Sequence, residues 1–245
     1  MKVLVLTGIQ EELTGLLSKF QFEFDKSVSC YRSAIHRDLY AATTGPGLSR
    51  KKQVRKIIED IFPDFIVNGG LTGILKYGDG LPGETLRVGC VADARTHTLY
   101  PGGRGRDTVV SVAQPVFEPW KKADLAEEFH ARACDMEAGP LMNLIGQMEG
   151  FKNQVNVVFC KVVGDNPEMY ELFLGESELR GWQRLSGWGK MKAVLRFSGG
   201  PWKAWKLLKL KRSALENLTD SLEKVCGILL EGQIPIDMDS LFIPH

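Results

Sequence analysis

The sequence predicts an α/β fold, because short apolar runs alternate with amphipathic segments and polar residues follow the apolar runs. Residues 3–6 and 65–67 are continuous apolar runs, which are typical of strands buried on both faces. Residues 10–20 carry leucines at helical spacing. Glycines or polar side chains follow the strands, and open α/β sheets bind their ligands at that edge.

The same patterns assign each element along the chain. Strands are expected at residues 3–6, 40–44, 65–68, 88–92, 109–112 and 155–161, and helices at 10–20, 51–61, 121–129 and 138–148. The chain from residue 169 onward is expected to be helical, with a final helix at 213–230. The last helix is the longest amphipathic segment, with Leu218, Leu222 and Val225 on one side. We expect a single domain over residues 1–245, since the length suits one α/β domain and no internal repeat is found.

Composition excludes several classes of protein. The formal net charge of +1 argues against a protein that binds nucleic acid over its whole surface. No apolar run approaches the roughly 18 residues of a membrane span, and the N-terminal run is too short for a signal peptide. The five cysteines are scattered without a CxxC pair, which indicates free thiols in a reducing compartment rather than a zinc site. We therefore expect a cytoplasmic protein that needs no metal or other cofactor.

Four segments after strands hold the side chains suited to a functional site. They are residues 8–12, 68–73, 135–137 and 161–165. The third, Asp135-Met136-Glu137, joins two acids to a thioether just before an apolar helix. A carboxylate there can bind sugar hydroxyls, and methionine offers a soft apolar surface to a ring. Each acid also has a purely structural interpretation, since Asp and Glu cap helices and complement the helix dipole in the first turn.

In this order the four segments resemble the nucleoside phosphorylase superfamily, and above all its methylthioadenosine/S-adenosylhomocysteine nucleosidases. The resemblance covers residues 1–165 and includes the Pro-Asp-Phe-Ile-Val-Asn run at residues 63–68 and the Gly78-Asp79 turn. It implies a three-layer α/β/α fold around a central mixed, twisted sheet, as in the phosphorylases and hydrolases of that superfamily. It also implies a purine nucleoside as substrate, no cofactor, and a homo-oligomer, at least a dimer.

The resemblance assigns roles that suit the cleavage of an N-glycosidic bond, which builds positive charge on the ribosyl ring and negative charge on the leaving base. Asp165 matches the acid that protonates the purine at N7. Glu137 matches the glutamate that binds the ribose 2′- and 3′-hydroxyls, with Met136 on the sugar face. Glu12 matches the glutamate that positions or deprotonates the attacking water, and Ile9 matches an apolar residue that lines the site.

Further contacts depend on the loops. The glycine-rich stretch at residues 70–73 is expected to form a turn that either cradles an anion or sugar oxygen or simply reverses the chain. Val116 stands where the family reads the adenine edge, and no chemistry of its own is assigned to Asp135. The additional substrate contacts expected are Leu71, Thr72, Gly73, Val116 and Asp135, and in a phosphorylase the phosphate contacts are Gly47, Arg50 and Thr72.

The chain departs from the family pattern at four positions. Leu71 stands where the family usually has a serine that contacts the nucleophile, and Asn68 stands where hexameric phosphorylases carry an arginine for phosphate. Lys161 and Gly164 replace an arginine and a serine ahead of Asp165, and the serine would have been a hydrogen-bond partner for that acid. The substitutions favour water over phosphate as the nucleophile and leave open a protein that binds nucleosides without cleaving them.

The segment of residues 180–212 is a second informative feature, with ten Lys or Arg residues, no acid and four of the five tryptophans. Tryptophan and lysine on an amphipathic helix suit an anionic membrane surface, and the hopanoid-biosynthesis branch of the same superfamily acts on an adenosylated membrane lipid. A solvated basic face with core-packed tryptophans is the favoured interpretation of this segment, and a nucleic-acid contact is the least favoured. Three hypotheses result: a cytoplasmic nucleosidase, a membrane-peripheral phosphorylase of a lipid-linked nucleoside, or a nucleoside-binding module without activity.

Overall fold

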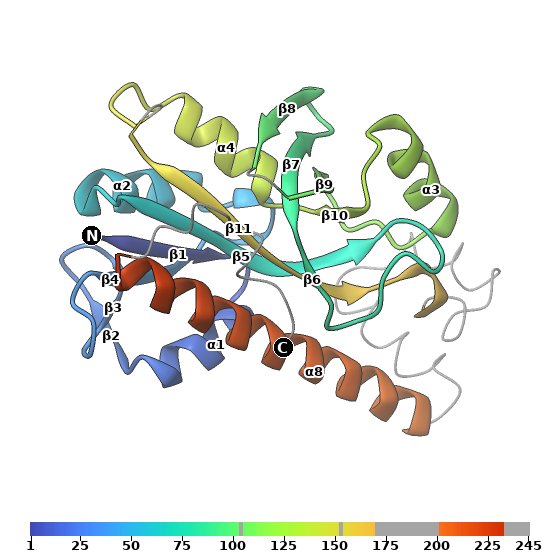
Figure 1. The fold of residues 1–245 in the computed structure, drawn as a ribbon, viewed down its shortest axis with the longest axis horizontal. Coiled ribbons are helices and arrows are strands. Elements are labelled where there is room, and N and C mark those ends of the chain that lie inside the picture. The colour runs from blue at the N-terminus through green and yellow to red at the C-terminus, as the bar shows by residue number, and fades with distance from the viewer. Residues whose placement is uncertain (103–104, 152–153, 170–200, 233–245) are drawn as a thin grey trace.

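The computed structural model describes residues 1–102, 105–151, 154–169 and 201–232, and for residues 201–208 it describes the helical backbone. Within these residues, eleven strands form one mixed sheet with helices on both faces (Figure 1). The strands are β1 (Val3–Thr7), β2 (Phe22–Asp25), β3 (Cys30–Ser33), β4 (Leu39–Thr43), β5 (Phe65–Ile74), β6 (Thr85–Leu86), β7 (Val88–Asp93), β8 (Thr98–Pro101), β9 (Asp107–Ser111), β10 (Ala133–Asp135) and β11 (Asn156–Asp165). The helices are α1 (Gln10–Lys19), α2 (Lys51–Ile61), α3 (Pro119–Glu128), α4 (Ala138–Gly146) and α8 (Pro201–Leu230), with a 3-10 turn η1 (Pro46–Leu48).

Strand β5 is the centre of the sheet, because it pairs with three other strands. Its first half lies parallel to β1, and nearly its whole length lies parallel to β11. Its last residues pair antiparallel with β10. The main strand order is β2-β3-β4-β1-β5-β10-β9-β7-β8, and β11 joins β5 to β6. The end of β1 therefore lies beside the middle of β5, and β10 lies beside its last residues.

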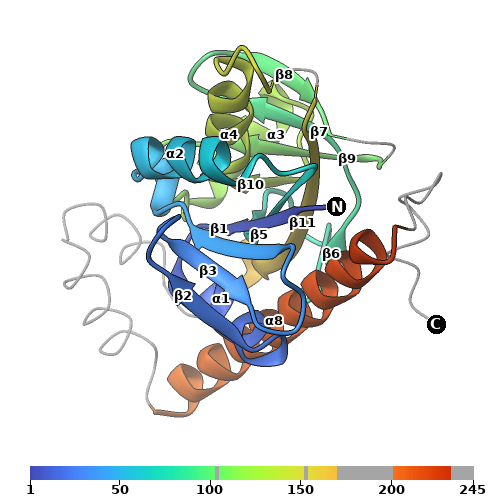
Figure 2. The same ribbon diagram turned by 90° about the vertical axis from the view of Figure 1, so that its left-hand side faces the viewer.

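Helices cover both faces of the β4-β1-β5 region. Helices α1 and α8 pack on one face through residues such as Leu13 and Leu222. Helices α2 and α4 pack on the other face through residues such as Ile58 and Leu141. Figure 2 shows β1 and β5 between these two pairs of helices. The predicted three-layer α/β/α fold with a mixed sheet is therefore confirmed.

The remainder of the sheet has its own core. Residues such as Val91, Val109 and Phe159 pack there with Ala138 at the start of α4. Helix α3 covers a neighbouring cluster through Ala126, which packs with Ala92 and Cys134. The cluster around Ala126 places α3 beside the ends of β5 and β10.

Helix α8 lies very close to the sheet and to α1 because glycines face it. A Cβ atom on Gly15 would lie 2.2 Å from Thr219 Oγ1, and one on Gly69 would lie 2.8 Å from Leu222 Cδ2. On the predicted apolar face of this helix, Leu218, Leu222 and Val225 are fully buried. The helix runs from Pro201 and includes the whole amphipathic segment predicted at residues 213–230, whereas residues 170–200, also predicted to be helical, lie outside the described residues. None of the described helices is long and apolar enough to cross a membrane.

The longer predicted elements are present, as is the short strand expected just before residues 135–137, which is β10; the short strands β2, β3, β6 and β8 were not predicted. One prediction is wrong: residues 70–73 do not form a turn, because β5 continues through them to Ile74. Glycine suits these positions because neighbouring side chains occupy the space of a Cβ. Leu222 lies against Gly69, Glu12 against Gly70 and Asp165 against Gly73.

Candidate functional site

Glu12 is a buried acid whose carboxylate is held by the backbone. It lies in the first turn of α1, and its Oε2 accepts hydrogen bonds from the N–H groups of Gly8 (2.9 Å) and Ile9 (3.2 Å). The bond from Ile9 is the return half of a capping box. Its Oε1 accepts a third bond from Leu71 N in β5 (2.8 Å), so the acid ties the helix start to the central strand. Burial raises the pKa of Glu12 above its ordinary value. The backbone hydrogen bonds act in the opposite direction, but their effect is smaller.

Glu137 lies next to Glu12. A Cβ atom on Gly8 would lie 3.0 Å from Glu137 Oε1 and 3.3 Å from Glu12 Oε2, so both carboxylates pack against the same glycine at the end of β1. Glu137 Oε1 also accepts a hydrogen bond from Gly47 N (3.1 Å), in the η1 turn. Burial, followed by repulsion from Asp135, raises the pKa of Glu137 to about 7. Glu137 can therefore exchange a proton near neutral pH.

Lys161 is a buried cation that interacts with both of these acids. Its side chain is 1% exposed, and its Nζ lies 2.7 Å from Asp135 Oδ2. Burial alone would lower the pKa of Lys161, but the carboxylates of Asp135, Glu137 and Glu12 raise it. Lys161 is therefore an ammonium surrounded by three acids.

The carboxylate of Asp135 is bound by other groups of the protein. Besides the ion pair with Lys161, its Oδ1 accepts a hydrogen bond from Ser111 Oγ (2.5 Å) and its Oδ2 accepts one from Ala138 N (3.0 Å). Ser111 Oγ also accepts a bond from Gly139 N, the second residue of α4 (2.7 Å). These three contacts occupy most of the roughly four acceptor positions of the carboxylate.

Asp165 lies at the end of β11, farther along β5. The register of β11 on β5 shifts between Val163 and Asp165, which is a bulge at Gly164 that sets Asp165 opposite Gly73. A Cβ atom on Gly73 would lie 2.7 Å from Asp165 Oδ1, so the carboxylate lies over the bare backbone of that glycine. Lys122 Nζ donates to Asp165 Oδ1 at 2.5 Å and to Ile74 O at 3.1 Å.

The pair of acids Glu12 and Glu137 is separated from Asp165 along β5. Lys161 pairs in register with Gly70 of β5, and Asp165 pairs with Gly73. Three residues of a strand span about 10 Å. The arrangement offers two neighbouring acids with a buried cation at one end and a single lysine-paired acid at the other. A ligand with a diol at one end and a hydrogen-bonding ring at the other would match it.

The remaining predicted residues lie at different distances from these acids. Met136 Cε lies 3.8 Å from the Cβ position of Gly47, so the methionine is beside the η1 turn. Thr72 is buried, and its hydroxyl donates to Val162 O (3.3 Å). Arg50 is exposed and donates to Thr43 Oγ1 (2.7 Å). Val116 is half-buried in the segment between β9 and α3.

Two of the departures from the family pattern are in contact with each other. A Cβ atom on Gly164 would lie 3.0 Å from the Cβ of Leu71 and 3.3 Å from its Cδ1. The leucine therefore occupies the space that a side chain at position 164 would need. Leu71 also packs against the core beneath α8, so the pair fits the fold and leaves only the backbone N–H of Leu71 directed at Glu12.

Sequence reasoning missed Lys122. Its side chain is fully buried, although lysine is almost never buried unless it is paired. The signal was its position one helical turn before Ala126, on the face of α3 that packs on the core. A lysine on the apolar face of a helix indicates a buried acid as its partner, but the sequence does not tell which one. No cluster of three metal-binding side chains occurs among the described residues.

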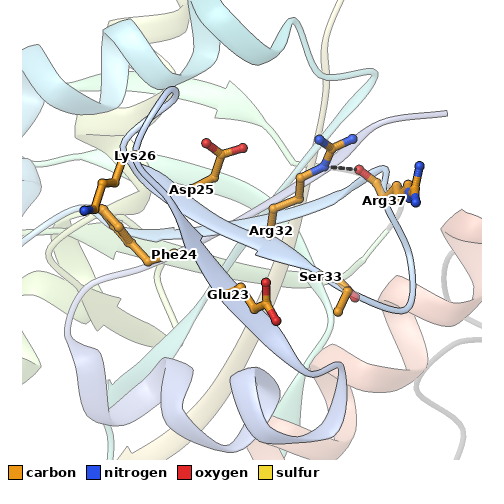
Figure 3. Close-up of a pocket in the computed structure, with 8 residues that line it drawn as sticks. Glu23, Phe24, Asp25, Lys26, Arg32, Ser33 and Arg37 are labelled. Atoms are coloured by element: carbon orange, nitrogen blue, oxygen red, sulfur yellow. Dashed lines mark hydrogen bonds between the residues drawn. The ribbon is translucent and has the colours of Figure 1, made fainter.

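A separate hollow lies on the β2–β3 hairpin at the edge of the sheet (Figure 3). Charged residues of both signs line it, among them Glu23, Lys26 and Arg32. Arg32 Nε donates to Arg37 O across its rim (2.8 Å). None of the residues predicted from the sequence to act in a site lines this hollow.

Comparison with solved structures identifies proteins of the same fold, whereas no protein-family model and no curated protein sequence matches the chain. The 5′-methylthioadenosine/S-adenosylhomocysteine nucleosidase of Helicobacter pylori is 14% identical, with a TM-score of 0.58 over 85% of this chain and 96% of that one. The futalosine hydrolase of Helicobacter pylori is 15% identical, with a TM-score of 0.58 and coverages of 86% and 97%. The 5′-methylthioadenosine nucleosidase of Arabidopsis thaliana is 16% identical, with a TM-score of 0.58 and coverages of 86% and 95%. The chain therefore has the fold of these nucleosidases, and the resemblance noted in the sequence holds at the level of fold.

Proposed function

We propose that the protein is an N-ribosyl hydrolase that uses water to release the free base from a purine nucleoside. The observation that carries this proposal is the contact of Glu12 and Glu137 with one glycine, Gly8, together with the electrostatic interaction of both acids with the buried ammonium of Lys161. The proposal is further supported by the fold, which is that of methylthioadenosine nucleosidases and a futalosine hydrolase.

The ribose end of the substrate is assigned to Glu137. A carboxylate can accept two hydrogen bonds from a cis-diol, and its negative charge favours the positive charge that develops on the ribosyl ring. The pKa of about 7 means that this acid is ionised in a growing fraction of molecules as the pH rises through neutrality. Lys161 favours the ionised form, because its ammonium attracts the charge. Met136, the preceding residue, would cover the sugar face.

Glu12 is assigned to the water. A general base must have a vacant proton-accepting position within hydrogen-bond distance of its water. The raised pKa of this buried carboxylate makes it a better base than an exposed glutamate. In the proposed step, water oxygen bonds to C1′ while Glu12 takes one of its protons and the electron pair of the glycosidic bond passes to the purine. Asp165 donates a proton to the purine at N7.

The choice of water over phosphate has a physical basis in this site. A phosphate group needs several N–H donors, but the amides of Gly8, Ile9 and Leu71 all donate to Glu12. Three acids surround one lysine, so a dianion would meet net negative charge. Asn68 is fully buried in β5, and the guanidinium of Arg50 is bonded to Thr43.

The test is a direct assay for released base. The protein is incubated separately with methylthioadenosine, S-adenosylhomocysteine, futalosine, adenosine and inosine, with and without inorganic phosphate, and the products are separated by chromatography. We expect free base and free ribosyl product from at least one nucleoside, at a rate independent of phosphate. Release only with phosphate, with a ribosyl phosphate as product, would identify a phosphorylase. Tight binding without release would identify a binding module, and either result would refute the hydrolase.

The membrane-peripheral hypothesis depends on the basic segment of residues 180–212, most of which lies outside the described residues. Its described side chains begin at Lys209, and Lys209, Lys211 and Arg212 are exposed on α8. Exposure alone does not identify them as lipid-binding residues, so we assign them no role in binding or in the reaction. The expected homodimer is likewise part of the proposal and is tested by light scattering of the purified chain.

A further inference from the structure

We propose that Lys122 is a positioning residue that holds Asp165 in place for proton transfer to the base. The inference rests on the proposed function and adds to it a residue from α3, an element in which no site residue was expected. The geometry that suggests it is a fully buried lysine whose ammonium lies 2.5 Å from a carboxylate that is one-third exposed.

The ammonium is fixed from more than one side. Its Nζ donates to Ile74 O in β5 (3.1 Å) as well as to Asp165 Oδ1 in β11, so Lys122 joins a helix to two strands. The Cβ position of Gly73 lies 3.0 Å from this nitrogen and 2.7 Å from Asp165 Oδ1. The ion pair therefore crosses β5 at its bare backbone, where a larger residue would push the two charges apart.

The pairing leaves one oxygen of the acid for a ligand. Lys122 contacts Oδ1, and no donor among the described residues contacts Oδ2. The neighbouring residue Gly164 offers no side chain that could orient the carboxylate. Without Lys122 the acid could rotate about its side-chain bonds, since a third of it is exposed. With Lys122 holding Oδ1, the carboxylate and its Oδ2 are kept in one orientation.

The lysine also has an electrostatic effect on the step. When Asp165 gives its proton from Oδ2 to N7, the glycosidic electron pair moves to the purine and a carboxylate remains. The ammonium of Lys122, itself fully buried, stabilises that carboxylate at close range. Lys122 thus acts through Asp165 and needs no contact with the substrate.

The first experiment compares Lys122→Met with the neighbouring variant Lys121→Met. Lys121 is half exposed and pairs with Glu118 on the same helix turn, so it controls for loss of a lysine from α3. In steady-state assays with the nucleoside that the wild type cleaves, we expect kcat of K122M to fall about 100-fold, as for loss of general acid catalysis. KM should stay within about threefold, and K121M should match the wild type in both constants. Lys122→Arg should recover part of kcat, because it keeps a charged donor to Oδ1.

A double-variant cycle separates positioning from a general loss of structure. If Lys122 acts through Asp165, then K122M combined with Asp165→Asn should be no slower than D165N alone. Thermal unfolding of all variants tests that they fold. If K122M unfolds, Lys122→Gln takes its place, since it keeps a hydrogen-bond donor without the charge.

The outcomes are distinct from those of the base-release assay. If the wild type releases no base from any nucleoside, the proposed hydrolase itself is refuted. If the wild type is active but K122M keeps its kcat within about threefold, the role of Lys122 is refuted. A loss that appears only in KM, or a K122R variant no better than K122M, would also overturn it.

Discussion

The ammonium of Lys161 lies 2.7 Å from the Oδ2 atom of Asp135, and both side chains are closed off from solvent. The pair joins β11 to β10, close to Glu12 and Glu137, the acids assigned to water and to ribose. A buried ion pair contributes little by itself to stability, but removal of one partner leaves the other charge uncompensated. Lys161 therefore determines the charge on which the rest of the site depends.

Lys161→Met should destabilise the fold strongly, because Asp135 would remain buried next to Glu137 without a cation. We expect a loss of about 3–5 kcal/mol in the free energy of unfolding, measured with urea. The double variant Asp135→Asn with Lys161→Met should be more stable than K161M, since the uncompensated charge is gone. Equal stability of the single and double variants would contradict the account of this pair.

Glu137 should make stability fall as the pH rises towards neutrality. Its pKa is about 7 in the folded protein against an ordinary value of 4.5, so between these values the folded state keeps a proton that the unfolded chain has lost. Stability supplied by the protonated acid is complete below pH 4.5 and is lost as the pH rises through about 7. Glu137→Gln cannot ionise, so relative to the wild type it should gain up to about 3 kcal/mol between pH 5 and pH 8. Unfolding at both pH values measures this difference, and a constant difference would argue against the raised pKa.

Glu12→Gln should remove activity and also weaken the fold. The two oxygens accept three backbone N–H bonds, and an amide nitrogen in place of one oxygen cannot accept them. We expect base release to slow by about 10²–10⁴-fold and stability to fall by about 1–3 kcal/mol. Glu11→Gln is the matched control, because Glu11 is exposed in the same helix turn and should behave as wild type. Comparable activity of the two variants would exclude Glu12 as the base.

Gly15→Ala should loosen the docking of α8. A methyl group there would lie 2.2 Å from Thr219 Oγ1 and 2.8 Å from Thr219 Cγ2, and threonine has few rotamers in a helix. We expect a loss of about 1–3 kcal/mol in unfolding free energy from overpacking. Thr219→Ala removes both atoms and should restore part of the stability in the double variant. The control is Gly146→Ala, since nothing lies within 4 Å of a Cβ at that position. If G15A is as stable as G146A, the close approach of α8 does not hold.

The sequence alone was enough to predict the α/β fold, the longer strands and helices, and the buried face of α8. Those features follow from the period of apolar residues, which local geometry imposes on any strand or helix. Short strands were missed because two to four residues carry too little periodicity to be distinguished from loops. The glycine-rich run at residues 70–73 was misread as a turn, because glycine in a strand depends on which side chains approach it from elsewhere.

What only the tertiary structure decided is the charge around each acid. The sequence singled out Glu12, Glu137 and Asp165, but it did not reveal that Glu12 caps three amides or that Asp135 is occupied by Ser111 and Lys161. It also gave no sign that Leu71 fills the space beside Gly164, or that Lys122 pairs with Asp165 from 43 residues away. Periodicity records which residues are buried together on one element. Ion pairs and close approaches join residues distant along the chain, so they exist only once the strands and helices have packed.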